Sequence, residues 1–250
     1  MLNSFDIPTL VLSALAVLIT LTMHEYAHGY AAYRLGDSTA KVFGRLSLNP
    51  IKHLDPIGAI CLLLFHFGWA KPVPINPRNF KNPKRDFALS ALAGPLVNII
   101  LSFVAAFFYL LALKNLYIYT LGEGFLARLA YNFILFLGIF HSINLGLGIF
   151  NLIPIPPLDG SRLLTAILPP KAYFGIMKYE RKIYFGFLIW MLLGSSVKSF
   201  LLSIPFVAQS SVLSAIAGVF SLSGMLSSLI GAISGLMLDI LGLIPFLKLY

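Results

Sequence analysis

The sequence predicts an all-α, polytopic membrane protein from its composition, its hydropathy and the length of its apolar runs. Of the 250 residues, 58% are hydrophobic and only 11% are charged, whereas about 25% of the residues of a soluble domain are charged. The mean hydropathy is +0.88, and several segments approach or exceed the ~20 apolar residues that a helix needs to cross a bilayer. The lipid bilayer is therefore the expected environment of the chain.

The first expected span covers about residues 8–35, and Gly36-Asp37-Ser38 ends it. The residues before it, 1–7, contain no Lys or Arg, so a cleaved signal peptide is not expected. Inside the span lies the sequence His24-Glu25-Tyr26-Ala27-His28. Ionisable residues in a span are costly, and they indicate a functional site by default.

The spacing of this motif predicts a metal site. Residues i and i+4 lie on the same face of a helix, so His24 and His28 can bind one metal ion together. Glu25 lies beside them, where a carboxylate can take a proton from a metal-bound water without being a ligand. The motif thus predicts hydrolytic chemistry within a membrane.

Two unusual segments follow the first span. The apolar piece 56–69 is too short to cross a bilayer, which predicts a re-entrant element that enters and leaves on one side. The next segment, 70–86, is basic and rich in proline, a residue that is confined to edge strands and bulges in sheets. We therefore expect a β-like edge strand over 71–80 that binds an extended substrate, through the residues Lys71, Pro72, Val73, Pro74 and Ile75.

Three more spans are predicted, at about 87–113, 129–153 and 183–202. The tail 211–247 is apolar and rich in Ser and Gly, and it fits either one long span with an interfacial helix or two short spans. These elements predict a three-span catalytic core with the re-entrant or β-like loop segment, over residues 1–165. C-terminal accessory helices would occupy 166–250.

The distribution of basic residues predicts an orientation. The N-terminus has no Lys or Arg, whereas the loops 34–53, 70–86 and 162–182 are all basic. Because cytoplasmic loops are enriched in Lys and Arg, we expect these loops in the cytoplasm and the N-terminus outside. The same loops account for the net charge of +9, so no nucleic-acid partner is implied. The active site then lies toward the cytoplasmic side.

A catalytic zinc ion needs three protein ligands and one open position for water. Asp159 is the favoured third ligand because it follows Asn151-Leu152-Ile153-Pro154-Ile155-Pro156-Pro157, where prolines break the helix and free backbone groups to line a polar cavity. The other residues that could supply this ligand are His141, His66, His53, Cys61 and Glu180.

Together, the three motifs of the core resemble a known family. His24-Glu25-Tyr26-Ala27-His28, Gly94-Pro95-Leu96-Val97-Asn98 and Asn151 to Gly160 resemble the signatures of the site-2 protease family (peptidase family M50) of intramembrane zinc metalloproteases. The run 68–77 resembles the compact prokaryotic branch of that family.

The resemblance implies a prokaryotic membrane protease that uses one Zn²⁺ per chain and cleaves peptide bonds within or next to transmembrane segments of membrane proteins, as in regulated intramembrane proteolysis. It implies that Asp159 is the third zinc ligand and Glu25 the general base. Asn98 and Asn151 would contact the substrate backbone or stabilise the oxyanion. The chain differs from better-known members because it has no evident span before the first motif and no PDZ-like or CBS-like domain, so their regulation is not carried over.

Three alternative interpretations apply to these residues. Asn98 on an apolar helix is more often a residue that hydrogen-bonds between helices. A membrane metal-ion transporter would need discontinuous helices in two corresponding halves, and the sequence has no such symmetry. A catalytically inactive scaffold would have no need for Glu25. No motif indicates a particular substrate, an activation signal or an oligomeric state.

Overall fold

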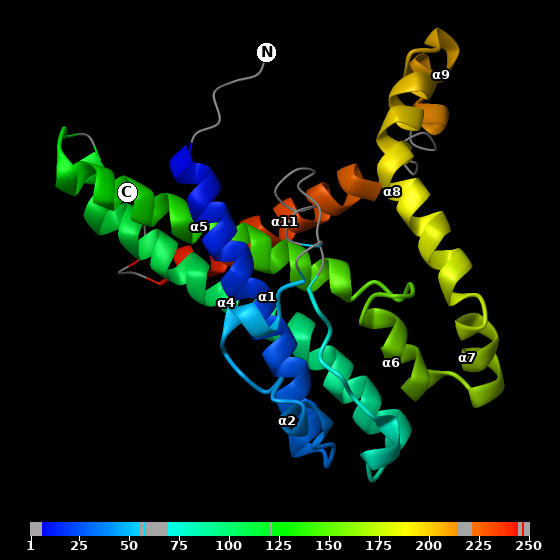
Figure 1. Cartoon of the computed structure of the whole chain (residues 1–250). Helices are drawn as coiled ribbons and strands as arrows, with labels where there is room; N and C mark the ends of the chain where they lie inside the picture. The colour runs from blue at the N-terminus through cyan, green and yellow to red at the C-terminus, as the bar shows by residue number, and fades with distance from the viewer. Residues whose placement is uncertain are drawn as a thin grey trace.

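In the computed structural model, the structure describes residues 7–55, 58, 70–120, 122–214, 222–244 and 247. Its α-helices are α1 (Ile7–Arg34), α2 (Thr39–Val42), α4 (Pro83–Thr120), α5 (Phe125–Asn151), α6 (Gly160–Ile167), α7 (Pro170–Met177), α8 (Glu180–Leu202), α9 (Pro205–Gln209) and α11 (Leu222–Gly242), as Figure 1 shows. Two short 3-10 helices, η1 (Pro50–Lys52) and η2 (Pro77–Asn79), lie between α2 and α4.

Within these described residues, four helices are long and apolar enough to cross a membrane. They are Ile7–Arg34, Pro83–Leu116, Phe125–Asn151 and Gly224–Gly242. The prediction of an all-α polytopic membrane protein is therefore confirmed. The region predicted as a span at 183–202 forms helix α8, which is not among these four, and the described part of the tail contains one long helix, α11.

Helices α1, α4 and α5 form the core. α4 packs along α5, and α1 crosses both of them (Figure 1). The approach of α5 to α4 is close at Gly148, because a Cβ there would lie 2.9 Å from Ile99 Cγ1 and 3.1 Å from the Pro95 carbonyl oxygen. α4 continues through Pro95 without ending.

Buried polar side chains join the core helices to each other and to α11. Asn144 Nδ2 on α5 donates to Thr20 Oγ1 on α1 at 2.8 Å. His141 Nδ1 lies 3.0 Å from the Ser102 carbonyl oxygen on α4, while its Nε2 lies 2.7 Å from Ser234 Oγ on α11. Such hydrogen bonds satisfy polar groups that lipid cannot satisfy, and they hold α11 against the core.

The expected edge strand at 71–80 does not form. The described residues of this region contain one isolated antiparallel bridge, between Leu54 and Ala70, and no strand. The prolines of segment 71–76 have no N–H, and the N–H groups of Val73 and Asn76 donate to the side chains of Glu25 and Asp37. Apart from the backbone hydrogen bond from Lys71 N–H to the His53 carbonyl oxygen at 2.9 Å, side chains hold the segment and no partner strand does. The predicted re-entrant piece 56–69 lies outside the described residues, apart from Gly58.

Candidate metal centre and active site

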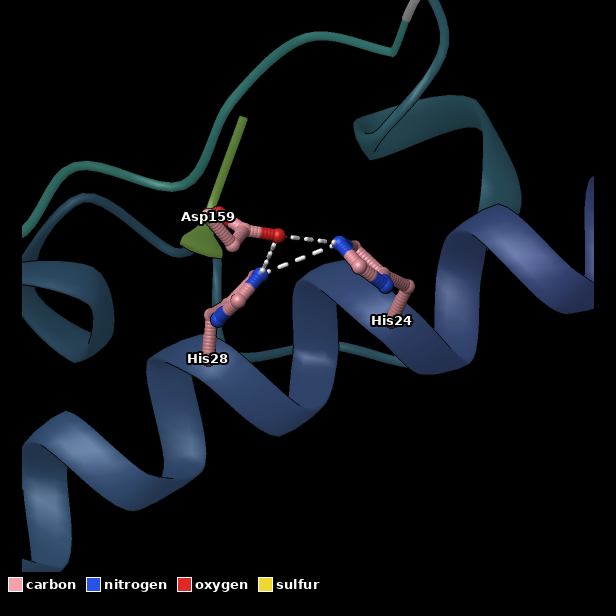
Figure 2. Close-up of side chains that lie close together, drawn as sticks. All are labelled: His24, His28 and Asp159. Carbon is pink, nitrogen blue, oxygen red and sulfur yellow. Dashed lines mark hydrogen bonds and ion pairs between the residues drawn. The ribbon is translucent and has the colours of Figure 1, made fainter. Parts of the chain in front are cut away.

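Three side chains from distant parts of the chain converge at one point. His24 and His28 lie on α1, and Asp159 is the residue before the first turn of α6. Asp159 Oδ2 lies 3.0 Å from Nε2 of His24 and 3.0 Å from Nε2 of His28. The two Nε2 atoms also lie 3.0 Å apart, so the three atoms form a compact triangle (Figure 2).

This donor set fits a zinc ion. Two imidazole nitrogens and one carboxylate oxygen are ligands that zinc uses in catalytic sites, where a fourth position stays open. A tetrahedral ion with ligands about 2.1 Å away separates its ligand atoms by about 3.4 Å, so a small outward shift of the three side chains admits it. Among the residues that the structure describes, no other group of three such side chains comes together.

Both histidines are oriented through their second ring nitrogen. His28 Nδ1–H donates to the Ser90 carbonyl oxygen at 2.8 Å, which leaves Nε2 free to bind a metal. His24 Nδ1 lies 3.1 Å from the Asn98 side-chain amide, which is fully buried. The other amide atom, Asn98 Oδ1, is buried without a partner. If the amide turns by 180°, Oδ1 accepts the proton that His24 must carry on Nδ1 when Nε2 binds a metal.

Two glycines leave room for this geometry. A Cβ on Gly94 of α4 would lie 2.3 Å from His28 Nε2 and 2.7 Å from His24 Cε1, so only glycine allows the α4 backbone to cover the imidazoles. A Cβ on Gly160 would lie 2.3 Å from the Leu152 carbonyl oxygen. Gly160 thus lets α6 start close against the end of α5, which places Asp159 opposite α1.

The extended segment 70–76 lies against the face of α1 that carries Glu25. Val73 N–H donates to Glu25 Oε2 at 2.8 Å. One turn later on α1, a Cβ on Gly29 would lie 3.1 Å from Val73 Cγ1, so this glycine forms a notch for the Val73 side chain. Helix α1 therefore contacts both the backbone N–H and the side chain of Val73.

Asp37, just beyond the end of α1, anchors the same segment further along. Its carboxylate is fully buried and accepts hydrogen bonds from Asn76 N–H at 2.7 Å, from Asn79 Nδ2 at 2.7 Å and from Thr39. Burial raises the pKa of the Asp37 carboxyl, but the donated hydrogen bonds outweigh burial and hold that pKa below its usual range. A lowered pKa gives stability to the folded protein that is present above the unfolded-state pKa of the group and is lost as the pH falls through its folded-state pKa. The Asp37 carboxylate is therefore charged at neutral pH and accepts all of these hydrogen bonds there.

A cavity of about 320 Å³ opens beside the three converging side chains. Its walls are mainly apolar and come from α1, from segment 70–75, from the end of α5, from the turn before α6 and from α8. The lining residues are Leu21, His24, Glu25, His28, Ala70, Pro72, Val73, Ile75, Leu147, Phe150, Asn151, Pro157, Leu158, Asp159, Arg162, Tyr184, Phe187 and Leu188.

Most of the residues expected from the sequence meet at this cavity. Glu25 and Asn151 line it, and Asn151 Nδ2 donates one hydrogen bond to the Leu147 carbonyl oxygen at 3.1 Å. Pro72, Val73 and Ile75 line it too, whereas Lys71, Pro74 and Asn98 are not among its lining residues.

The alternative third ligands lie elsewhere or outside the described residues. His141 joins α5 to α4 and α11, and His53 Nε2 lies 2.7 Å from the Ser47 carbonyl oxygen. Glu180 begins α8 and does not belong to the triangle. Cys61 and His66 lie outside the described residues.

Sequence reasoning missed two contributions to the cavity. The sequence predicted Arg162 only as one of the basic residues of the cytoplasmic loop 162–182. It follows Asp159 by three residues, which places it one helical turn from that side chain. Tyr184, Phe187 and Leu188 of α8 carry no motif, and their apolar pattern is that of any membrane helix. Their spacing of three and four residues put them on one face, but nothing in the sequence indicated what that face would meet.

Comparisons with protein families and with known proteins both indicate a zinc metalloprotease. The family model of peptidase family M50 matches residues 12–194. The Bacillus subtilis protein YwhC, provisionally named a zinc metalloprotease, is 43% identical over 179 residues, which are 72% of this chain and 78% of that protein.

More distant relatives match over somewhat shorter lengths of the chain. Rip2 of Mycobacterium tuberculosis has the same provisional name and is 31% identical over 160 residues, 62% of this chain and 56% of that protein. A zinc metalloprotease of Methanocaldococcus jannaschii is 29% identical over 164 residues, 64% of this chain and 34% of that protein. No solved structure matches the chain significantly.

Replacing Gly94 with alanine is expected to weaken zinc binding about 10–100-fold, the usual effect of disturbing the residues that orient metal ligands. The added methyl group would occupy the space of the His28 imidazole, 2.3 Å from Nε2. Metal analysis of the purified protein, titrated with a competing chelator, measures the change. Gly138→Ala is the matched control, because a Cβ there meets its nearest neighbour, Tyr109 Cε2, at an ordinary 3.4 Å. Equal zinc affinity in the two variants would contradict the prediction.

Asp37→Ala is expected to release segment 70–79 from α1 while zinc stays bound. Trypsin should then cut faster after Arg78, which is followed by Asn79, and KM for a peptide substrate should rise about tenfold, equivalent to about 1.4 kcal/mol. Digestion followed by mass spectrometry and steady-state kinetics measure the two effects. Glu123→Ala, at an exposed turn before α5, is the control. If Asp37→Ala digests like the control, Asp37 does not anchor the segment.

Proposed function

The chain belongs to peptidase family M50 and is an intramembrane zinc metalloprotease, and from this premise we propose that it cleaves peptide bonds within or next to transmembrane segments of membrane proteins. The observation that carries the proposal is the convergence of His24, His28 and Asp159 beside Glu25, in a cavity whose walls are mainly apolar. Apolar walls suit the side chains of a transmembrane segment better than those of a soluble peptide.

The proposed roles of the site residues follow from their positions. His24, His28 and Asp159 would hold the zinc ion, which when bound polarises the scissile carbonyl group and lowers the pKa of its water to about 7. Glu25 lies next to His24 in the chain and lines the same cavity. Its carboxylate takes the proton of the attacking water and later delivers that proton to the leaving amine.

The two asparagines would support different steps. Asn98 is buried against His24 Nδ1, so we assign it to orienting that imidazole. Asn151 lines the cavity and has used one of its two amide hydrogens on the Leu147 carbonyl oxygen. Its other amide hydrogen can bind a carbonyl oxygen of the substrate backbone.

The substrate would lie along the segment Lys71 to Ile75. A transmembrane helix keeps its carbonyl groups in internal hydrogen bonds, so it must unwind locally before the attack. Pro72, Val73 and Ile75 line the cavity and present an extended backbone beside Glu25. The Lys71 carbonyl oxygen accepts from Arg45 Nη2, so an unwound substrate strand could pair with the carbonyl groups that follow it in this segment.

The proposed orientation puts the active site toward the cytoplasm of a prokaryotic cell and the N-terminus outside. Exposed basic residues near the end of α1 and the start of α4 support it, because cytoplasmic ends are enriched in Lys and Arg; these are Lys41, Lys71, Lys81, Lys84 and Arg85. We also propose that residues 1–165 form the catalytic core and residues 166–250 an accessory region. Helix α8 of the accessory region forms one wall of the cavity.

Glu25→Gln and Asp159→Ala are expected to fail in different ways. Glu25→Gln should lower the cleavage rate about 10²–10⁴-fold, the range for a lost general base, and should keep its zinc. Asp159→Ala should lose both zinc and activity, because a ligand is gone. Cleavage of a transmembrane substrate in detergent, followed by mass spectrometry, and metal analysis of the same samples measure both effects.

The matched control for this pair is Glu123→Gln, at an exposed position between α4 and α5. If the purified Glu25→Gln variant still cleaves the substrate, Glu25 is not the general base. A wild type that binds zinc but cuts no membrane protein would instead indicate a metal carrier or a scaffold.

A further inference from the structure

Arg162 lies in the first turn of α6, three residues after the proposed metal ligand Asp159. Its N–H donates to the Asp159 carbonyl oxygen at 2.9 Å, so the two residues belong to one helical turn. The Arg162 side chain lines the same cavity as His24 and Glu25. A permanent positive charge therefore stands in the wall of the active site.

The guanidinium group is held in place by an aromatic ring. Arg162 Cζ lies 5.4 Å from the centre of the Phe87 ring on α4, a cation–π distance. Among the described residues, the guanidinium makes no ion pair and no hydrogen bond, whereas Arg34, Arg45 and Arg85 each donate to an oxygen. Contact with the ring face leaves the N–H groups at the edge of the guanidinium unpaired.

A charge without a partner is costly in a partly buried, mainly apolar cavity. The carboxylates of the cavity do not relieve this cost. Asp159 Oδ2 is shared by His24 and His28, and Glu25 Oε2 accepts from Val73 N–H. An anion that forms only during the reaction would meet five unused donors at Arg162.

Peptide hydrolysis generates such an anion, and few other residues can meet it. Asn98, a candidate from the sequence, is buried against His24 and does not line the cavity. Apart from the two histidines, the lining side chains that have hydrogen-bond donors are Asn151, Arg162 and Tyr184. Of these, Arg162 alone carries a positive charge.

We propose that Arg162 is a catalytic residue that donates hydrogen bonds to the scissile carbonyl oxygen as it becomes negatively charged. This proposal rests on the proposed function. Water oxygen forms a bond to the carbonyl carbon, its proton passes to Glu25, and the carbonyl π electrons move onto the oxygen that Arg162 contacts. When the C–N bond breaks, those electrons re-form the carbonyl group and the Glu25 proton goes to the amine. Arg162 remains protonated throughout.

Kinetics on the purified full chain test this role. Arg162→Gln is expected to lower kcat about 10²–10³-fold, the usual loss on removing one oxyanion donor, with KM and zinc content close to those of wild type. Arg162→Lys should retain part of the activity, because an ammonium group keeps the charge but not the planar fork of donors. Arg128→Gln is the control, since Arg128 is exposed near the start of α5, at the opposite end from Asn151.

A binding measurement separates this role from the proposed function. A phosphinic peptide mimics the anionic tetrahedral intermediate, and a hydroxyethylene peptide of the same sequence is uncharged. Arg162→Gln should lose affinity for the phosphinic peptide about 100-fold relative to wild type and should keep its affinity for the neutral peptide. This comparison needs no turnover, so it assesses Arg162 even if no membrane protein is cleaved.

Other outcomes would overturn the proposal. A rise in KM with unchanged kcat would mean that Arg162 binds the ground state, and an effect confined to substrates with acidic side chains would mean that it binds a carboxylate. Loss of zinc in Arg162→Gln would mark Arg162 as a support for Asp159. Equal affinity of wild type and variant for the phosphinic peptide, or no binding by either, would also exclude the oxyanion contact.

Discussion

The contact between the imidazoles of α1 and the Asp159 carboxylate is the interaction on which the rest of the structure depends. Polar groups at membrane depth have no water to satisfy them, so protein or a bound ion must do so. Two glycines make the contact possible: Gly94 lets the α4 backbone cover the histidines, and Gly160 lets α6 begin against the end of α5. Packing of α4 against both α1 and α5 then sets the width of the site. Without this packing, the ligands from α1 and α6 would have no fixed separation.

Helix α1 organises the candidate active site beyond the two histidines. Glu25 accepts from the Val73 backbone, Gly29 gives space to the Val73 side chain, and Asp37 beyond the helix end binds Asn76. One rigid element thus fixes two candidate ligands, the proposed general base and the segment proposed to hold substrate. This arrangement suits catalysis, because a small error in the position of a substrate relative to the base is costly in rate.

The cavity combines charged groups with apolar walls. Glu25, Asp159 and Arg162 share it with side chains such as Phe150 and Phe187. Electrostatic interactions are stronger in such surroundings than in water, so a hydrogen bond to a developing charge has a larger effect on rate. Helix α8 supplies part of the apolar wall, so the cavity depends on a helix other than α1, α4 and α5.

The sequence by itself determined the membrane class, the helical fold and the candidate metal-binding pair, because apolar length and the i, i+4 spacing are local properties of the chain. Its preference for Asp159 as third ligand agrees with the triangle that the structure forms. The strand expected at 71–80 was wrong, because Glu25 and Asp37 take the N–H groups that a sheet would use. Only the tertiary structure decided that Asn98 faces His24, that His141 joins helices and that Arg162 and α8 line the cavity. Each of these outcomes depends on which helix faces which, and that follows from packing between segments far apart in the sequence.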